Sequence, residues 1–263
     1  MAENIKVPTM AELLAQGQSP EVLFWVGCAG SFDERAKRIT KAFVKLLNKA
    51  NVSFAVLGTE ESCTGDPAKR AGNEFLFQMQ AMMNIEVLNG YEVKKIVTAC
   101  PHCFNTIKNE YPELGGNYEV LHHTQFLKSL FDDGRLKVAG GEFKGKKITF
   151  HDPCYLGRAN NVYEAPRELV QKLDAELVEM KRSRKNGLCC GAGGAQMFKE
   201  PENGDKDINI ERTEDALETN PNIIAAGCPF CNTMMTDGVK NKEKEGQVKV
   251  MDIAELIAQA AEI

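Results

Sequence analysis

The nine cysteines of this 263-residue chain follow one pattern that occurs twice. The first copy comprises Cys28, Cys63, Cys100 and Cys103, and the second comprises Cys154, Cys189, Cys190, Cys228 and Cys231. Equivalent cysteines are separated by nearly constant intervals: 126 residues from Cys28 to Cys154, 127 from Cys63 to Cys190, and 128 from Cys100 to Cys228 and from Cys103 to Cys231. The pattern predicts a duplicated fold with two lobes, each with a thiolate site for a metal ion or an iron–sulfur cluster.

Apolar runs and helical periodicities alternate along both halves of the chain. The expected strands are 22–26, 54–57, 96–99 and 118–121, and then 147–151, 176–180, 223–226 and 248–250. The expected helices are 32–48, 67–88 and a segment from Cys103 onward, and then 162–173, 208–218, 231–242 and 253–261. This alternation favours parallel sheets with right-handed crossovers, so we expect an α/β protein with two tandem Rossmann-like lobes related by internal duplication. The expected boundaries are an N-terminal extension at 1–20, a first cysteine-rich lobe at 21–143 and a second at 144–263.

Composition and charge exclude several classes of protein. The net charge of −5 and the pI near 5.6 argue against a general nucleic-acid or anionic-membrane surface. No apolar run reaches the roughly 18–20 residues that cross a bilayer, and residues 1–18 lack the apolar core of a secretory signal. We therefore expect a cytoplasmic protein, which would lie at a membrane only through a partner. Cytosolic thiols stay reduced, and an odd number of them cannot all pair, so metal ligation is favoured over disulfides.

The positions of the cysteines relative to the expected elements support a binding site. Every cysteine or cysteine pair follows an expected strand and precedes an expected helix. This is the carboxyl edge of a parallel sheet, where open α/β folds bind their ligands. The free N–H groups and positive dipole end of a following helix also lower the pKa of a thiol. We expect four sulfurs to meet in the first lobe and five in the second.

Two other interpretations of the cysteines are open at this point. The segment Cys100–Cys103, a Cys-x-x-Cys after a strand, is also typical of a thioredoxin-like redox pair, although a dithiol would need no duplication. A tetrahedral zinc ion takes four ligands, which the first-lobe cysteines would supply. The five cysteines of the second lobe exceed the need of zinc or of an ordinary cubane cluster. That surplus favours an iron–sulfur cluster of unusual shape.

The second copy has the spacing of a known module. Between Cys154 and Cys189 lie 34 residues, and between Cys190 and Cys228 lie 37. With its flanking segments, this arrangement resembles the cysteine-rich domain, the CCG module found in the B subunit of heterodisulfide reductase. Similar modules occur in iron–sulfur subunits of glycolate and lactate oxidation systems and in electron-transfer-flavoprotein-linked membrane reductases. The resemblance extends over nearly the whole chain from Val22 onward.

The resemblance implies a noncubane [4Fe–4S] cluster in the second lobe, held by Cys154, Cys189, Cys190, Cys228 and Cys231. In the methanogen enzymes, such clusters reduce a disulfide. The first copy departs from the family at Ser62-Cys63-Thr64-Gly65, which stands where the family has Cys-Cys-Gly. With one thiolate missing, the first lobe could hold an ordinary [4Fe–4S] cubane, a zinc ion, or a cluster with Ser62 as an oxygen ligand. Iron–sulfur is the favoured choice.

Two residues near the second-lobe cysteines are candidate catalytic residues. His151 could donate a hydrogen bond to the cluster or a proton to a departing thiol, although histidines at strand ends more often serve the structure alone. Arg158 could hold an anionic substrate or close an interface. His123 is a weaker candidate for a residue that supports the ligands. The charged run 181–185 and the polar stretch 199–207 are expected to be exposed loops.

The sequence lacks a ferredoxin cluster motif, a GxGxxG fingerprint and a flavin signature. Clusters in such a chain have no internal route to a soluble donor such as NADH. We therefore expect the iron–sulfur subunit of a multi-subunit oxidoreductase, one that relays electrons or reduces a disulfide or a quinone-type acceptor. Its partner would be a ferredoxin-type iron–sulfur subunit or a membrane or flavoprotein redox partner. The alternatives are a zinc-stabilised scaffold and an independent thiol–disulfide oxidoreductase.

Overall fold

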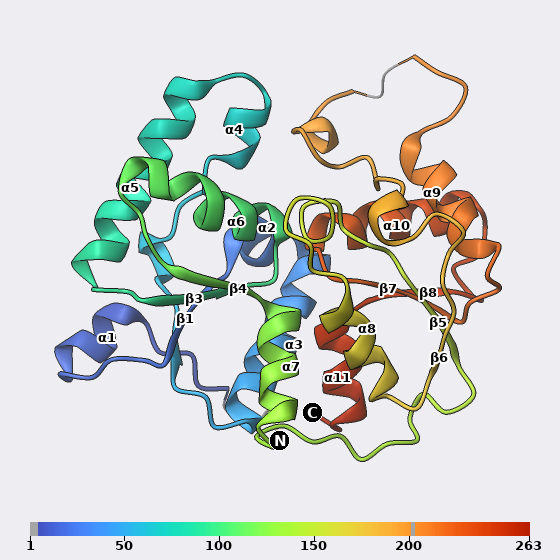
Figure 1. The fold of residues 1–263 in the computed structure, drawn as a ribbon, viewed down its shortest axis with the longest axis horizontal. Coiled ribbons are helices and arrows are strands. Elements are labelled where there is room, and N and C mark those ends of the chain that lie inside the picture. Colours follow the sequence, from blue (N-terminus) through green and yellow to red (C-terminus); the bar gives the residue numbers. More distant parts are fainter. Residues whose placement is uncertain (1–4, 201–202) are drawn as a thin grey trace.

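A computed structural model describes residues 5–200 and 203–263 of the chain. Its strands form two four-stranded sheets, ordered β2-β1-β3-β4 and β6-β5-β7-β8, in which all pairings are parallel (Figure 1). The same strand order in both halves confirms the expected tandem Rossmann-like lobes. The strands are β1 Val22–Trp25, β2 Phe54–Ala55, β3 Lys95–Thr98, β4 Glu119–His122, β5 Lys147–Phe150, β6 Glu176–Leu177, β7 Ile223–Ala226 and β8 Lys249–Asp252.

Helices connect these strands and cover the sheets. Those of the first lobe are α1 Met10–Ala15, α2 Gly27–Phe32, α3 Glu34–Lys49, α4 Asp66–Arg70, α5 Glu74–Gly90, α6 Pro101–Asn105 and α7 His123–Asp132. Those of the second are α8 Glu164–Gln171, α9 Ile208–Leu217, α10 Pro229–Asn241 and α11 Ile253–Ala260. Both faces of the sheets are covered, which explains why β1 and β7 are apolar and buried along their whole length.

Four helices between the two sheets join the lobes (Figure 1). Helix α3 packs against α11, and α7 packs against α8. One hydrophobic cluster passes through this bundle, from Phe24 and Phe43 in the first lobe to Phe150 and Leu169 in the second. The pairing is pseudosymmetric, because α7 and α11 each follow the last strand of their own lobe. The two lobes therefore share a core.

Two expected helices have different bounds in the structure. The expected helix 32–48 begins only at Glu34, because the Asp33 carboxylate accepts a 2.7 Å hydrogen bond from the Ala36 amide and caps α3. The expected helix 67–88 is divided into α4 and α5 by a turn at Gly72, whose φ is +86°. Glycine adopts this left-handed conformation without steric cost.

The expected strand 176–180 is also shorter in the structure. It pairs with β5 only over Glu176–Leu177, and an irregular segment then leads to Cys189. The tandem cysteines of the second lobe therefore do not follow a strand directly. They still lie between β6 and α9 along the chain, as expected, but a long irregular segment separates them from β6.

The described part of the expected N-terminal extension packs against the first lobe. Thr9 pairs with Val56 and caps α1, and Met10 and Leu13 enter the first-lobe core. Residues 1–4 lie outside the described residues. The expected lobe boundary falls in the segment between α7 and β5 and stays a prediction. Within residues 5–200 and 203–263, no helix combines the length and apolar character needed to cross a bilayer.

Candidate metal centres

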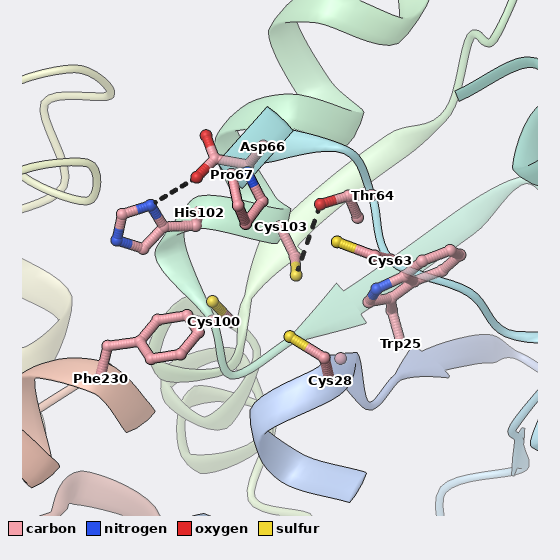
Figure 2. Close-up of a pocket in the computed structure, with 11 residues that line it drawn as sticks. Trp25, Cys28, Cys63, Thr64, Asp66, Pro67, Cys100, His102, Cys103 and Phe230 are labelled. Atoms are coloured by element: carbon pink, nitrogen blue, oxygen red, sulfur yellow. Dashed lines mark hydrogen bonds and ion pairs between the residues drawn. The ribbon is translucent and has the colours of Figure 1, made fainter. Parts of the chain in front are cut away.

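The four cysteines of the first lobe line one pocket. Cys28 lies in α2, Cys63 in the loop before α4, and Cys100 and Cys103 at the start of α6. Their sulfur atoms point into a common space (Figure 2). None of the nine cysteines of the chain forms a disulfide. The structure thus brings together the four thiols that the sequence analysis assigns to this lobe.

A buried carboxylate ties two of these cysteine segments together. Glu61 accepts hydrogen bonds from the backbone amides of Val26 (2.9 Å) and Gly27 (2.6 Å). Because Glu61 lies two residues before Cys63, these bonds fix the Cys63 loop against the turn that carries Cys28. Burial raises the pKa of Glu61 to about 7, against the stabilising effect of the two amides.

The five cysteines of the second lobe come from three segments. Cys154 lies in the turns after β5, Cys189 and Cys190 follow the irregular segment, and Cys228 and Cys231 begin α10. The Sγ atoms of Cys190 and Cys231 are 3.3 Å apart, and the Gly191 amide lies 3.3 Å from Cys189 Sγ as a donor. This lobe also brings its predicted thiols together.

Contact between sulfurs changes their acidity within each lobe. The interaction with Cys28 lowers the pKa of Cys63 to about 7, although burial opposes the shift. Interactions with Cys154 and Cys190 lower the pKa of Cys189 well below that of a free thiol. Thiolates are the form that binds metals, and four or five thiolates in contact need a cation among them. Both donor sets therefore fit an iron–sulfur cluster, and the first also fits a zinc ion.

The two thiol sets lie side by side across the lobe boundary. The thiol of Cys100 interacts with Cys103 of its own lobe and with Cys228 of the other, and both interactions lower its pKa. Phe230, from the second-lobe Cys-Pro-x-Cys segment, lines the first-lobe pocket (Figure 2). The two sites therefore form one continuous region of the molecule.

His102 holds in the first-lobe Cys-Pro-x-Cys segment the position that Phe230 holds in the second, and it contacts residues of the second lobe. Its ring centroid lies 4.5 Å from that of Tyr155, which follows Cys154, and 5.6 Å from that of Phe230. Its Nδ1 lies 2.9 Å from an oxygen of Asp66. Burial lowers the pKa of His102, but the Asp66 carboxylate acts together with Cys100 and Cys189 in the opposite direction, and the net shift is upward. His102 thus contributes a hydrogen-bonded ring to the wall between the sites.

Comparison with known proteins identifies the repeat. A family model described as the cysteine-rich domain matches residues 22–108 and again residues 148–236. The chain belongs to the cysteine-rich domain family. The expected family resemblance is confirmed, in both lobes.

Three relatives are similar to this cysteine-rich domain protein over nearly its whole length. A probable iron-sulfur-binding oxidoreductase, FadF, of Bacillus subtilis is 50% identical over 98% of the chain and 36% of the relative. An EtfAB:quinone oxidoreductase of Syntrophomonas wolfei is 47% identical over 97% of the chain and 37% of the relative. The D subunit of a dihydromethanophenazine:CoB--CoM heterodisulfide reductase of Methanosarcina barkeri is 35% identical over 91% and 59%. The chain thus spans little more than a third of the first two relatives.

His151, a predicted candidate, lies beside the second-lobe thiols. One of its ring nitrogens and the Sγ atoms of Cys190 and Cys231 all lie within 4.8 Å of one another. Its Nδ1 accepts a 3.0 Å hydrogen bond from Nε of Arg212, so the proton of the neutral ring is on Nε2. Nε2 is buried and has no hydrogen-bond partner among residues 5–200 and 203–263. Burial, with the Arg212 charge, lowers the pKa of His151 to about 3 and keeps the ring neutral.

Arg212 was not found by sequence reasoning. It is fully buried in α9, and its Nη1 donates to Asp215 and to the carbonyl of Arg182. The available signal was its position on the helix, one turn from the buried Asn209 and Ala216. The expected exposed run 181–185 is thus partly tied down, since Arg182 also pairs with Glu211.

A second buried arginine, also missed, supports the segment that leads to the tandem cysteines. Arg167 donates to both oxygens of Asp152 (2.7 and 2.9 Å) and to both oxygens of Glu179 (2.6 and 2.8 Å). Asp152 also accepts a 2.7 Å bond from the Arg184 amide. The signal was an arginine one helical turn before the buried Val170 of α8. This network joins β5, β6 and α8 to the segment that carries Cys189.

The other predicted residues have different surroundings. Arg158 is exposed and donates a 3.0 Å hydrogen bond to the carbonyl of Gly187, near Cys189; its catalytic role stays a prediction. His123 Nε2 is 2.8 Å from Asp252 of the second lobe, so its contact is at the lobe interface. In the polar stretch 199–207, residues 201 and 202 lie outside the described residues, and 203–207 are exposed.

Proposed function

We propose that this chain is the iron–sulfur unit of a larger oxidoreductase that resembles heterodisulfide reductase. The observation that carries the proposal is the gathering of nine free thiols into two adjacent sets, one in each lobe. The names of the relatives support it, because all three are called oxidoreductases or reductases and one is called iron-sulfur-binding. The chain spans only part of each relative, so the complete activity would need further modules.

The proposed cofactors follow from the two donor sets. Cys154, Cys189, Cys190, Cys228 and Cys231 would hold a noncubane [4Fe–4S] cluster, and Cys28, Cys63, Cys100 and Cys103 would hold a [4Fe–4S] cluster or a zinc ion. A bound iron–sulfur cluster supplies reversible uptake of single electrons. The chain itself buries five of the nine cysteines and holds His151, with its proton on Nε2, so that one ring nitrogen lies within 4.8 Å of the sulfurs of Cys190 and Cys231.

The contact between the two sites would provide a short path for an electron from one site to the other. Because Cys100 and Cys228 interact across the lobe boundary, an electron that reaches either site is next to the other. The proposed role is a relay that ends in reduction of a disulfide or a quinone-type acceptor. The proposed donor is a ferredoxin-type iron–sulfur subunit or a flavoprotein, either of which could place the complex at a membrane.

The first test is composition. Protein purified without oxygen is expected to contain about eight irons and eight sulfides if both lobes hold [4Fe–4S] clusters. About four irons with one zinc would assign a structural ion to the first lobe, whose four thiolates also suit zinc. Zinc without sulfide would contradict the proposal and leave a cysteine-rich scaffold.

The ligand assignment has a direct test in Cys190→Ser. Cys190 is buried and lies 3.3 Å from Cys231, so the substitution should remove one thiolate from the second set alone. We expect loss of the second-lobe EPR signal, an unchanged first-lobe signal and a near-native circular dichroism spectrum. Retention of all iron and of both signals would show that Cys190 is not a ligand.

A further inference from the structure

The two repeats keep one register through their second cysteine segment. From Cys28 to Cys154 and from Cys63 to Cys189 the interval is 126 residues, and from Gly65 to Gly191 it is again 126. In this alignment of the two repeats, Thr64 corresponds to Cys190. The register assumed in the sequence analysis instead paired Cys63 with Cys190 and Ser62 with Cys189. That alignment requires one extra residue in the second copy between its first and second cysteine segments, whereas the constant interval requires none.

Backbone geometry agrees with the constant interval. Gly65 has a φ of +88° and Gly191 a φ of +90°. In each lobe the glycine amide approaches the sulfur of the cysteine two residues earlier, at 3.5 Å for Cys63 and 3.3 Å for Cys189. The two segments therefore form the same turn, with a left-handed glycine at the same place. The earlier register of Ser62 was wrong.

The residue inside this turn has the same neighbour in both lobes. Thr64 Oγ1 lies 3.9 Å from the sulfur of Cys103 (Figure 2). In the second lobe, Cys190 Sγ lies 3.3 Å from the sulfur of Cys231. Cys103 and Cys231 are the last cysteines of the two Cys-Pro-x-Cys segments. Both turn residues are buried, with 2% exposure for Thr64 and 4% for Cys190. A hydroxyl thus replaces the fifth sulfur.

Ser62 has a different environment. Its hydroxyl donates a 2.9 Å hydrogen bond to Oδ1 of Asn84, on α5. The Asn84 amide group in turn donates to the Cys63 carbonyl (2.9 Å) and the Tyr111 hydroxyl (3.1 Å). This network fixes the outer side of the Cys63 loop. It gives Ser62 a structural partner away from the sulfurs.

We propose that Thr64 is the residue that limits the first lobe to four thiolates and so determines which centre this lobe holds. The inference rests on the proposed function, since it requires both thiol sets to bind metal. A threonine hydroxyl is a hard donor that stays protonated, whereas a cysteine at this position would supply a soft thiolate. The first lobe therefore selects a four-thiolate [4Fe–4S] cluster or zinc, and the second a five-thiolate cluster.

The test compares Thr64→Cys with Thr64→Ser, two variants that differ only in sulfur against oxygen. Thr64→Cys should convert the first-lobe centre into the kind found in the second lobe, so that the second-lobe EPR or Mössbauer signal doubles and the first-lobe signal disappears. Thr64→Ser should retain the wild-type metal content and spectrum. Ser62→Cys, in the same loop, should also leave both signals unchanged, because position 62 faces Asn84.

The outcomes separate this proposal from the proposed function. If the wild type contains iron and sulfide but Thr64→Cys leaves its spectrum unchanged, or Ser62→Cys alone converts it, the role of Thr64 is wrong and the proposed function stands. If the wild type contains neither iron nor sulfide, the proposed function fails, and the role of Thr64 fails with it. Iron and sulfide content, measured on folded protein with a native circular dichroism spectrum, decides between these outcomes.

Discussion

The buried guanidinium of Arg212 determines which ring nitrogen of His151 carries the proton. Arg212 donates to Nδ1 of His151, which leaves the ring proton on Nε2, and the ring lies beside the second-lobe sulfurs. A hydrogen bond to cluster or ligand sulfur raises the reduction potential of the cluster. A cluster held by these cysteines would offer an acceptor for Nε2, which has no hydrogen-bond partner in the described part of the chain.

Replacing His151 by leucine should therefore lower the potential of the second-lobe cluster. A charge-assisted hydrogen bond contributes about 1.5 kcal/mol, which corresponds to about 60 mV for one electron. Potentiometric titration followed by EPR measures the shift. The first-lobe centre of the same variant is the internal control, since His151 lies beside the second-lobe sulfurs of Cys190 and Cys231. Equal potentials in variant and wild type would exclude the hydrogen bond.

The sequence predicted which thiols gather in each lobe, but it did not predict the residues that position the segments carrying them. Repeated spacing depends on the chain alone, so the two sets of thiols that the structure brings together could be read from it, and their role as ligands stays a prediction. Arg167 and Arg212 act through contacts with distant segments, and nothing in their own neighbourhood shows which carboxylate or ring they meet. Thr64 was misread because the tandem cysteines can be aligned in two registers; the constant interval of 126 residues favours one of them, and backbone conformation agrees with it.

On the scale of elements, a buried ion pair rather than strand pairing holds the segment before Cys189 in place. Helix α8 brings Arg167 to Asp152 at the end of β5, and Asp152 holds the Arg184 amide in the approach to the cysteines. The expected strand 176–180 pairs with β5 only over Glu176–Leu177, at the edge of the sheet. After Leu177, where regular pairing with β5 ends, side-chain contacts hold the segment in place.

Arg167→Met should be strongly destabilising, because it leaves the Asp152 carboxylate buried without its cation. Breaking a buried pair costs about 3–5 kcal/mol, which corresponds to a fall in Tm of about 10 °C for a chain of this size. Thermal melting followed by circular dichroism measures the effect. The matched control is Lys37→Met, which removes an exposed pair with Glu34 and should move the Tm by about 2 °C or less. A similar small shift for Arg167→Met would remove the structural role given to this pair.

On the scale of the whole molecule, the lobes meet through the bundle of α3, α7, α8 and α11. Alternating strands and helices predicted two parallel sheets, because that pattern is local. It could not predict which helices face each other, since each has an apolar face that either sheet could cover. The contact of His123 with Asp252 belongs to this interface, and both residues are fully buried.

This shared core should make the lobes unfold together. We expect a single calorimetric transition for the complete chain, because separation would expose the apolar cluster that runs from Phe24 to Leu169. A fragment limited to residues 144–263 should be insoluble or lack a cooperative transition for the same reason. Two well-separated transitions in the complete chain would show that the lobes are independent.

The difference between Thr64 and Cys190 also bears on evolution within a duplicated chain. Two identical halves would hold two equivalent centres, and an electron would have no preferred place to rest between them. In the proposed assignment, one side chain in a turn that both halves share makes their two centres unequal. The molecule would thereby acquire a polarity between its halves that duplication alone could not provide.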